Sequence, residues 1–178
     1  MSAAYIIIII IFVILIVLGI IGIGFYNKIL FRKKRVEDKL NSIKTSIKER
    51  NEIIRRLNTL FANSSFHEDD LMLELNDLYI KINDNSDTTL NLMNNTDKLL
   101  VKALSLESLY QELSKNQEYN SLKELFKDNQ YKVMYGVETY NEEVSEYNTY
   151  RNKPIISIVN KVCKFPDYDI YRKDKNGI

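Results

Sequence analysis

The residues from Tyr5 to Phe25 read YIIIIIIFVILIVLGIIGIGF, a run of 21 residues without a charged side chain. An α-helix rises about 1.5 Å per residue, so a helix of this length spans about 31 Å, the thickness of a bilayer's hydrocarbon core. In lipid, a helix also lets one segment satisfy all of its own backbone hydrogen bonds. The sequence therefore predicts a transmembrane helix over 5–25.

The charges that flank this run predict its orientation. Residues 1–4 are uncharged, whereas five basic residues follow the run: Lys28, Arg32, Lys33, Lys34 and Arg35. By the positive-inside rule, the body is cytoplasmic and the short N-terminus 1–4 is outside the cell membrane. The run is too long for a cleaved signal peptide, and Phe25 and Tyr26 make a poor cleavage site. The same basic cluster can contact anionic lipid, but a topology signal is the favoured interpretation.

The composition narrows the class of the body. The chain has 178 residues and a net charge of +1, which gives no global basic field for nucleic acid. Two prolines and five glycines are few for this length, which favours long helices over a turn-rich β fold. With one cysteine, Cys163, the chain cannot form an intramolecular disulfide.

Hydrophobic periodicity predicts the helices. An apolar stripe from Val36 to Phe61 follows the anchor without Gly or Pro, which predicts one long helix without a hinge, with a break near Asn27 as the alternative. A second stripe starts at Leu71 and keeps its phase to Tyr110, but it crosses the polar residues DNSDTT at 84–89. A single helix with a polar layer is favoured there, and a break at 84–88 remains open.

The rest of the chain predicts one more long helix between shorter elements. A short helix or turn is expected from Ser105, followed by a last long helix from Glu118 to the Lys153-Pro154 pair. The apolar residues 155–163 then either cap the bundle or lie on the membrane, and capping is preferred. The charged, Tyr-rich residues 166–178 predict a loose tail.

The single histidine lies in a predicted helix start. Ser65 to Glu68 forms a capping box, in which Ser65 is the N-cap and Glu68 reaches back to it. His67 lies inside this box, and the sequence HEDDL does not match the HExxH pattern of zinc proteases. A structural role is therefore favoured over a metal-binding or catalytic role for His67. No catalytic residue, metal site or cofactor is predicted.

Two sets of residues carry a resemblance to a known family. The first, aligned without a gap, is Tyr26-Asn27, Val36, the run 49–54 and the pair His67-Glu68. The second is the pattern Y-N-x-x-V-x-x-Y-N, formed by Tyr140, Asn141, Val144, Tyr147 and Asn148. With these, the chain resembles the LemA family of membrane-anchored helical proteins of bacteria. It departs from the family pattern at Leu40, where a Trp is usual, and at Arg55-Arg56, where a Pro-Asn pair is usual.

The resemblance covers residues 26–165 and implies a domain that is an antiparallel up-and-down four-helix bundle. It also implies a non-enzymatic membrane protein. The periodicity alone predicts only long amphipathic helices that pack together, as in a bundle or coiled coil. Tyr140, Val144 and Tyr147 share one helix face, so packing is the favoured role of the signature, and a binding role for Asn141 and Asn148 is the alternative.

Three functions follow as hypotheses. The favoured one is a membrane-anchored scaffold that binds protein partners or itself, in contact with the lipid bilayer but with no nucleic acid or small-molecule substrate. The second is a lipid-binding or membrane-shaping protein that acts through the basic cluster and the segment 155–163. The third, an enzyme, has no supporting motif in the sequence.

Overall fold

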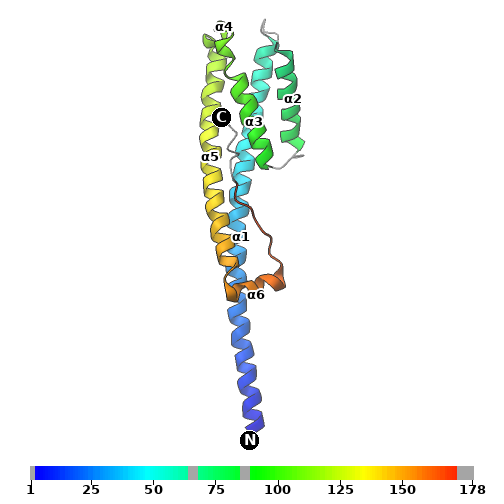
Figure 1. The fold of residues 1–178 in the computed structure, drawn as a ribbon, viewed down its shortest axis with the longest axis vertical. Coiled ribbons are helices and arrows are strands. Elements are labelled where there is room, and N and C mark those ends of the chain that lie inside the picture. The colour runs from blue at the N-terminus through cyan, green and yellow to red at the C-terminus, as the bar shows by residue number, and fades with distance from the viewer. Residues whose placement is uncertain (1–2, 64–67, 85–88, 172–178) are drawn as a thin grey trace. The chain divides into compact units, whose positions relative to one another are not determined.

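The computed structural model describes residues 3–63, 68–84 and 89–171. Within these ranges every regular element is helical, which confirms the all-α class (Figure 1). The elements are α1 (Ala3–Ala62), α2 (Asp69–Asp84), α3 (Thr89–Ala103), a 3-10 turn η1 (Leu106–Ser108), α4 (Gln111–Ser114), α5 (Gln117–Arg151) and α6 (Pro154–Cys163). The described part of the chain thus has more helices than the four expected.

Helix α1 joins the apolar run to the body without interruption. It is 60 residues long, so the predicted helix without a hinge at Asn27 is confirmed. None of the most apolar window is buried by other parts of the described chain. Among the described helices, α1 is the one long and apolar enough to cross a membrane.

The chain divides into two compact units. Residues 39–139 form one unit, here called the middle unit. Residues 1–38 and 140–178 form the other, here called the anchor unit because it contains the apolar run. Helices α1 and α5 each contribute one part to each unit.

In the middle unit, the predicted stripes form the core. The buried residues from α1 and α2 include Ile43, Ile47, Ile54, Leu57, Phe61, Leu71, Leu75, Leu78 and Ile82. Helix α5 adds Leu122, Phe126 and Val133. Gly136 of α5 lies close to α1, because a Cβ built on it would come within 3.1 Å of the Ile43 side chain.

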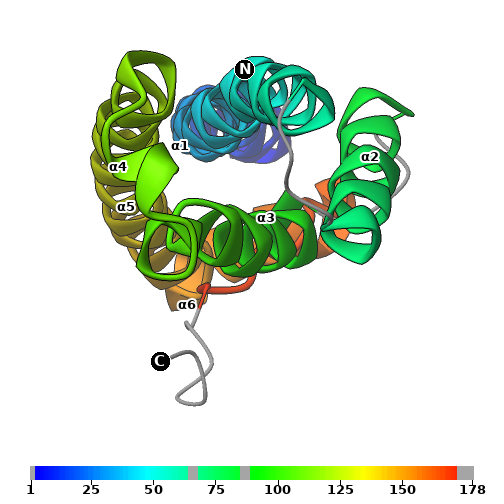
Figure 2. The same cartoon turned by 90° about the horizontal axis from the view of Figure 1, so that it is seen from above.

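The favoured single helix across residues 84–89 was wrong. Helix α2 ends at Asp84, α3 begins at Thr89, and the two pack against each other side by side (Figures 1 and 2). Residues 85–88 lie outside the described ranges. Asn, Asp, Ser and Thr are poor helix formers, and here that preference outweighed the continuous hydrophobic phase.

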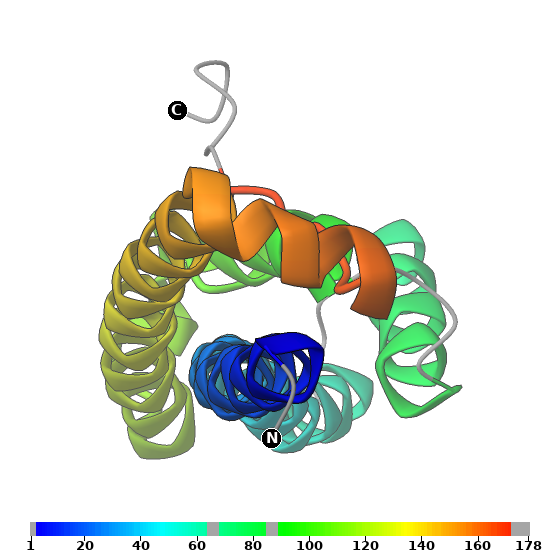
Figure 3. The same cartoon turned by 90° about the horizontal axis from the view of Figure 1, so that it is seen from below.

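In the anchor unit, α5 and α1 share a core that includes Ile29, Val36, Val144 and Tyr147. Helix α6 begins at Pro154, a residue suited to the first turn of a helix, and lies crosswise to α1 (Figures 1 and 3). It ends at Cys163, and the next residue, Lys164, adopts the left-handed conformation with φ of 50° and caps the helix. The chain then turns back along the unit.

Candidate functional site

The chain that follows α6 is held by the signature motif of α5. The Tyr147 hydroxyl donates to the carbonyl of Pro166 at 2.7 Å, and the Asn148 amide donates to the carbonyl of Tyr168 at 2.9 Å. One two-turn step earlier along α5, the Asn141 amide donates to the carbonyl of Tyr171 at 2.9 Å. We call residues 165–171 the C-terminal segment and the α5 side chains that hold it the clasp.

Further bonds close the clasp at both edges. The Tyr140 hydroxyl donates to the carbonyl of Asp169 at 3.2 Å. Arg151 donates to the carbonyls of Phe165 and Pro166 at 3.2 and 2.7 Å, and it forms an ion pair with Asp167. The C-terminal segment up to Tyr171 is therefore ordered against α5, unlike the loose tail predicted from residue 166. Residues 172–178 lie outside the described ranges.

The spacing of the two asparagines explains how the clasp binds the main chain of the segment. Asn141 and Asn148 are seven residues apart, which is about 10.5 Å along a helix. The carbonyls that they bind belong to Tyr168 and Tyr171, and a nearly extended chain covers about 10 Å in three residues. The two repeats match, so both amides can bind one extended main chain.

One side chain of the segment is also recognised. The ring of Tyr168 packs edge-on against Tyr147, with centroids 5.3 Å apart. Its hydroxyl donates to Glu37 of α1 at 2.9 Å. Lys33 lowers the pKa of Glu37 by hydrogen bonding to it, which keeps this carboxylate charged and available as an acceptor.

Burial raises the pKa of the three tyrosines at this site. Desolvation raises the pKa of Tyr140 and of Tyr147 above the ordinary value. Burial, and then the hydrogen bond to Glu37, raise the pKa of Tyr168 strongly. All three hydroxyls are therefore donors at physiological pH. The arrangement binds main-chain carbonyls.

The other signature residues of the anchor unit differ in their surroundings. The Tyr26 ring lies 5.6 Å from the Phe165 ring, measured between centroids. Val36 and Val144 are fully buried, and Asn27 is exposed. Of the three residues predicted to pack, Tyr140, Val144 and Tyr147 are all buried, and the asparagines of α5 bind the C-terminal segment rather than another helix.

Most of the basic cluster is paired within the anchor unit. Arg32 and Arg35 form ion pairs with Glu146 and Glu143 of α5 at 2.6 and 2.5 Å. Lys33 pairs with Glu37 at 2.9 Å. Lys28 and Arg32 lie over the Tyr150 ring, 5.4 and 5.1 Å from its centroid. Lys34 is exposed.

The predicted corner before α2 is described only in part. Ser65 and His67 lie outside the described ranges, so the capping box stays a prediction. Helix α2 begins at Asp69, and the carbonyl of Glu68 accepts from the backbone N–H of Met72 at 2.9 Å. The Glu68 carboxylate accepts a hydrogen bond from the Tyr110 hydroxyl at 2.8 Å.

The middle unit contains a buried arginine, which lies within the apolar stripe from Val36 to Phe61. Arg50 has 0% of its surface exposed. Its Nε donates to Asn129 at 2.7 Å, and its Nη1 lies 2.9 Å from Asp97. The guanidinium also stacks over Phe126. Desolvation lowers the pKa of Arg50, yet the charge persists because an arginine starts from a very high value.

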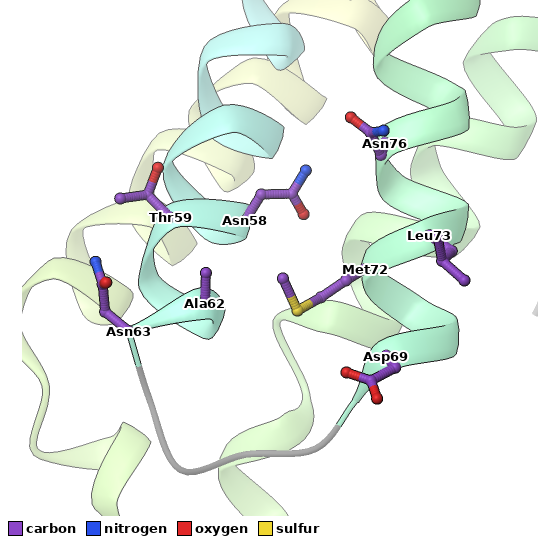
Figure 4. A pocket seen from close by; sticks show the side chains of 8 residues that line it. All are labelled: Asn58, Thr59, Ala62, Asn63, Asp69, Met72, Leu73 and Asn76. Atoms are coloured by element: carbon purple, nitrogen blue, oxygen red, sulfur yellow. The ribbon is translucent and has the colours of Figure 1, made fainter.

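The middle unit also has an open cleft of about 690 Å³ between the end of α1 and the start of α2 (Figure 4). It is lined by Asn58, Thr59, Ala62, Asn63, Asp69, Met72, Leu73 and Asn76. Asp69 is the single ionisable group of this lining, so the cleft offers polar amides and one carboxylate but no acid–base pair. Within the described ranges, no cluster of three or more His, Cys, Asp or Glu side chains is arranged to bind a metal ion.

Comparison with known proteins identifies the family of the chain. A family model described as the LemA family matches residues 39–177. No curated protein and no solved structure matches the chain. By its fold, the described part of the chain is all-helical and has a long apolar N-terminal helix. The chain belongs to the LemA family, and the matched range includes both the signature motif and the C-terminal segment.

Proposed function

We propose that this LemA family protein is a single-pass membrane protein that holds protein partners, or further copies of itself, at the cytoplasmic face of the membrane. In this role α1 is the anchor, and the body is a non-enzymatic scaffold. The clasp is the observation that carries the proposal. Side chains of α5 hold an extended segment through its main chain, which is how a peptide-binding surface works.

The anchor supports the location. The most apolar part of α1 is uncovered by the described chain, and an apolar surface of that size is unfavourable in water. The basic residues after the run favour a cytoplasmic body. The alternative function, lipid binding through the basic cluster, has less support because Arg32, Lys33 and Arg35 are already neutralised by carboxylates.

In-membrane photocrosslinking tests the proposal. A photoreactive amino acid replaces Thr149, an exposed residue of α5 beside the clasp, in the full chain in its membrane. A matched control carries the same group at Lys44, an exposed residue of the middle unit. We expect a discrete protein adduct, or an adduct with a second copy, at position 149 alone. If both positions give only lipid and intrachain products, the scaffold proposal fails.

A further inference from the structure

Helix α6 presents an apolar face that the described chain does not cover. Ile155, Ile158 and Val162 are 66%, 65% and 78% exposed. Their spacing of three and four places them on one face of the helix. Ile156, on another face, is 3% exposed and holds α6 to the anchor unit. Helix α6 therefore has two apolar sides: one is buried in the anchor unit, and the other faces outward.

Both ends of α6 are fixed at the exit of the apolar run of α1. At its start, Lys153 lies over the Tyr150 ring at 5.5 Å, and Lys28 lies over the same ring at 5.4 Å. At its end, Phe165 contacts Tyr26, with ring centroids 5.6 Å apart. Tyr26 and Lys28 directly follow the predicted span 5–25. These contacts place α6 at the level where α1 leaves the hydrocarbon.

The orientation of α6 suits a surface at this level. Figure 3, which views the chain from the N-terminal end of α1, shows α6 lying across the anchor unit rather than along α1. Where the span of α1 stands upright in the bilayer, a helix that runs crosswise to it at its exit lies close to the plane of the membrane. Lysines occur at both flanks and in the helix, namely Lys153, Lys161 and Lys164. Interfacial helices combine an apolar face with such basic residues.

We propose that the face formed by Ile155, Ile158 and Val162 is a lipid-binding surface that rests on the same leaflet through which α1 exits. The inference rests on the proposed anchoring of α1, and it adds a second membrane contact that the basic cluster does not supply. The ligand is the headgroup and upper acyl region of the bilayer, which takes up exposed aliphatic side chains at modest depth. Three exposed aliphatic residues that would otherwise face water are covered in this way.

The single cysteine of the chain allows the first part of the test. Cys163 is exposed and follows Val162, so an environment-sensitive fluorophore attached to it reports on this face. The full chain is reconstituted in vesicles of zwitterionic and anionic phospholipid. We expect strong quenching by a lipid that carries a nitroxide near its headgroup end, and weak quenching by aqueous iodide.

Two engineered positions make the result specific. In the Cys163→Ser background, Ile158→Cys carries the label on the proposed face, and Glu142→Cys carries it at an exposed site on α5. Position 158 should be quenched by the lipid nitroxide and position 142 by iodide. Equal access of iodide to both positions would overturn the inference. Shielding of position 158 from both quenchers would also overturn it, because the face would then be covered by protein.

A second variant keeps the fold and removes the face. Because Ile155, Ile158 and Val162 are exposed, replacing all three by Ser should leave α6 in place, with Ile156 still buried. The Cys163 label should then lose its quenching by the lipid nitroxide, whereas Met134→Ser, at an exposed apolar residue of the middle unit, should change nothing. Unchanged lipid quenching in the triple variant would contradict the proposal.

Alkaline extraction of the same vesicles separates the two proposals. If the chain remains in the membrane but the label is exposed to iodide, the α6 surface fails and the anchor stands. If the chain is extracted, the anchor fails, and the α6 surface fails with it.

Discussion

The side-chain amide of Asn141 binds both backbone polar groups of Tyr171. Its Nδ2 donates to the Tyr171 carbonyl at 2.9 Å, and its Oδ1 accepts from the Tyr171 N–H at 2.8 Å. An asparagine that binds one residue in this way makes the two backbone hydrogen bonds that a neighbouring β-strand would otherwise make. The C-terminal segment is therefore fixed in register on α5 without a sheet.

Removing this pair should loosen the segment. Asn141→Ala deletes two hydrogen bonds, each worth about 1 kcal/mol net, so the amide of Tyr171 should exchange about 10- to 30-fold faster. Hydrogen–deuterium exchange with mass spectrometry of the full chain in detergent micelles measures this rate. Thr149→Ala, at an exposed position of the same helix, is the control. Equal exchange in the two variants would show that Asn141 does not hold the segment.

Arg50 should be the most sensitive position of the middle unit. Arg50→Ala leaves the buried Asn129 and the partly exposed Asp97 without their partner, so the cost should lie at or below the about 3–5 kcal/mol that is typical of a fully buried pair. Arg50→Met, which fills the same space, should cost less. Urea unfolding followed by far-UV circular dichroism gives the free energy of unfolding.

Arg55 provides the matched control for Arg50. Its side chain is exposed and pairs with Glu52 on the same helix, so Arg55→Met should change the free energy of unfolding by less than about 1 kcal/mol. Similar losses at the two arginines would show that the buried contacts of Arg50 with Asp97 and Asn129 do not stabilise the middle unit.

Tyr119 should make the stability fall at high pH. It is fully buried, and its hydroxyl donates to the carbonyl of Ala103 at 3.0 Å. Burial raises the pKa of Tyr119 to about 12 from the ordinary 10.0. Since the folded state holds this proton more tightly than the unfolded state, the stabilising effect is complete below pH 10 and is lost as the pH rises to 12.

The difference between wild type and Tyr119→Phe isolates this effect from the other tyrosines and the lysines. Over that pH range the wild type should lose up to about 2 kcal/mol more than the variant. Thermal unfolding at a series of pH values measures it. Parallel pH profiles for the two proteins would mean that Tyr119 ionises as easily in the folded chain as in the unfolded one.

The carboxylates of α5 should restrain the basic cluster. In Glu143→Gln with Glu146→Gln, Arg32 and Arg35 lose their ionic partners, so the affinity for anionic lipid should rise by several-fold at low salt. Enrichment of a fluorescent anionic lipid around the chain in nanodiscs reports it. Glu138→Gln with Glu142→Gln, at exposed positions of α5, keeps the net charge matched. An equal rise in this control would assign the effect to net charge alone.

The orientation of the anchor is open to a direct measurement. With a cytoplasmic body, protease added to intact cells should leave the body whole, and protease added to inverted membrane vesicles should remove it. A cytoplasmic marker protein controls for leakage. Digestion of the body from outside intact cells would reverse the proposed topology.

The sequence predicted the elements that depend on local pattern. The apolar run, the continuous stripe from Val36 to Phe61 and the end of the last long helix before Pro154 were all readable, because each depends on residues close in the chain. That Pro154 also starts α6 was not predicted. The break between α2 and α3 was misjudged because two local signals disagreed there. The polar residues at 84–89 opposed helix formation, while the hydrophobic phase on either side agreed by coincidence.

The site depended on a pairing that periodicity does not encode. Tyr147 and Asn148 were singled out by the signature, but their partners are backbone carbonyls about 20 residues later, and a carbonyl has no identity in a sequence. The one signal available in the segment was its content of tyrosine, with Tyr168 and Tyr171 among its seven residues. Arg50 was similarly visible as an interruption of the stripe, yet its partners Asp97 and Asn129 come from distant helices.

The anchor unit is made of the first and last parts of the chain, whereas the middle unit is one continuous stretch. Synthesis proceeds from the N-terminus, and domains tend to fold as units as they emerge. Residues 39–139 can therefore fold while the ribosome is still adding α6. The anchor unit has to wait for Tyr168 and Tyr171, which are synthesised after the whole of the middle unit. A chain released early would carry a folded middle unit beside an anchor unit that never closes, and quality-control proteases would meet that open end first.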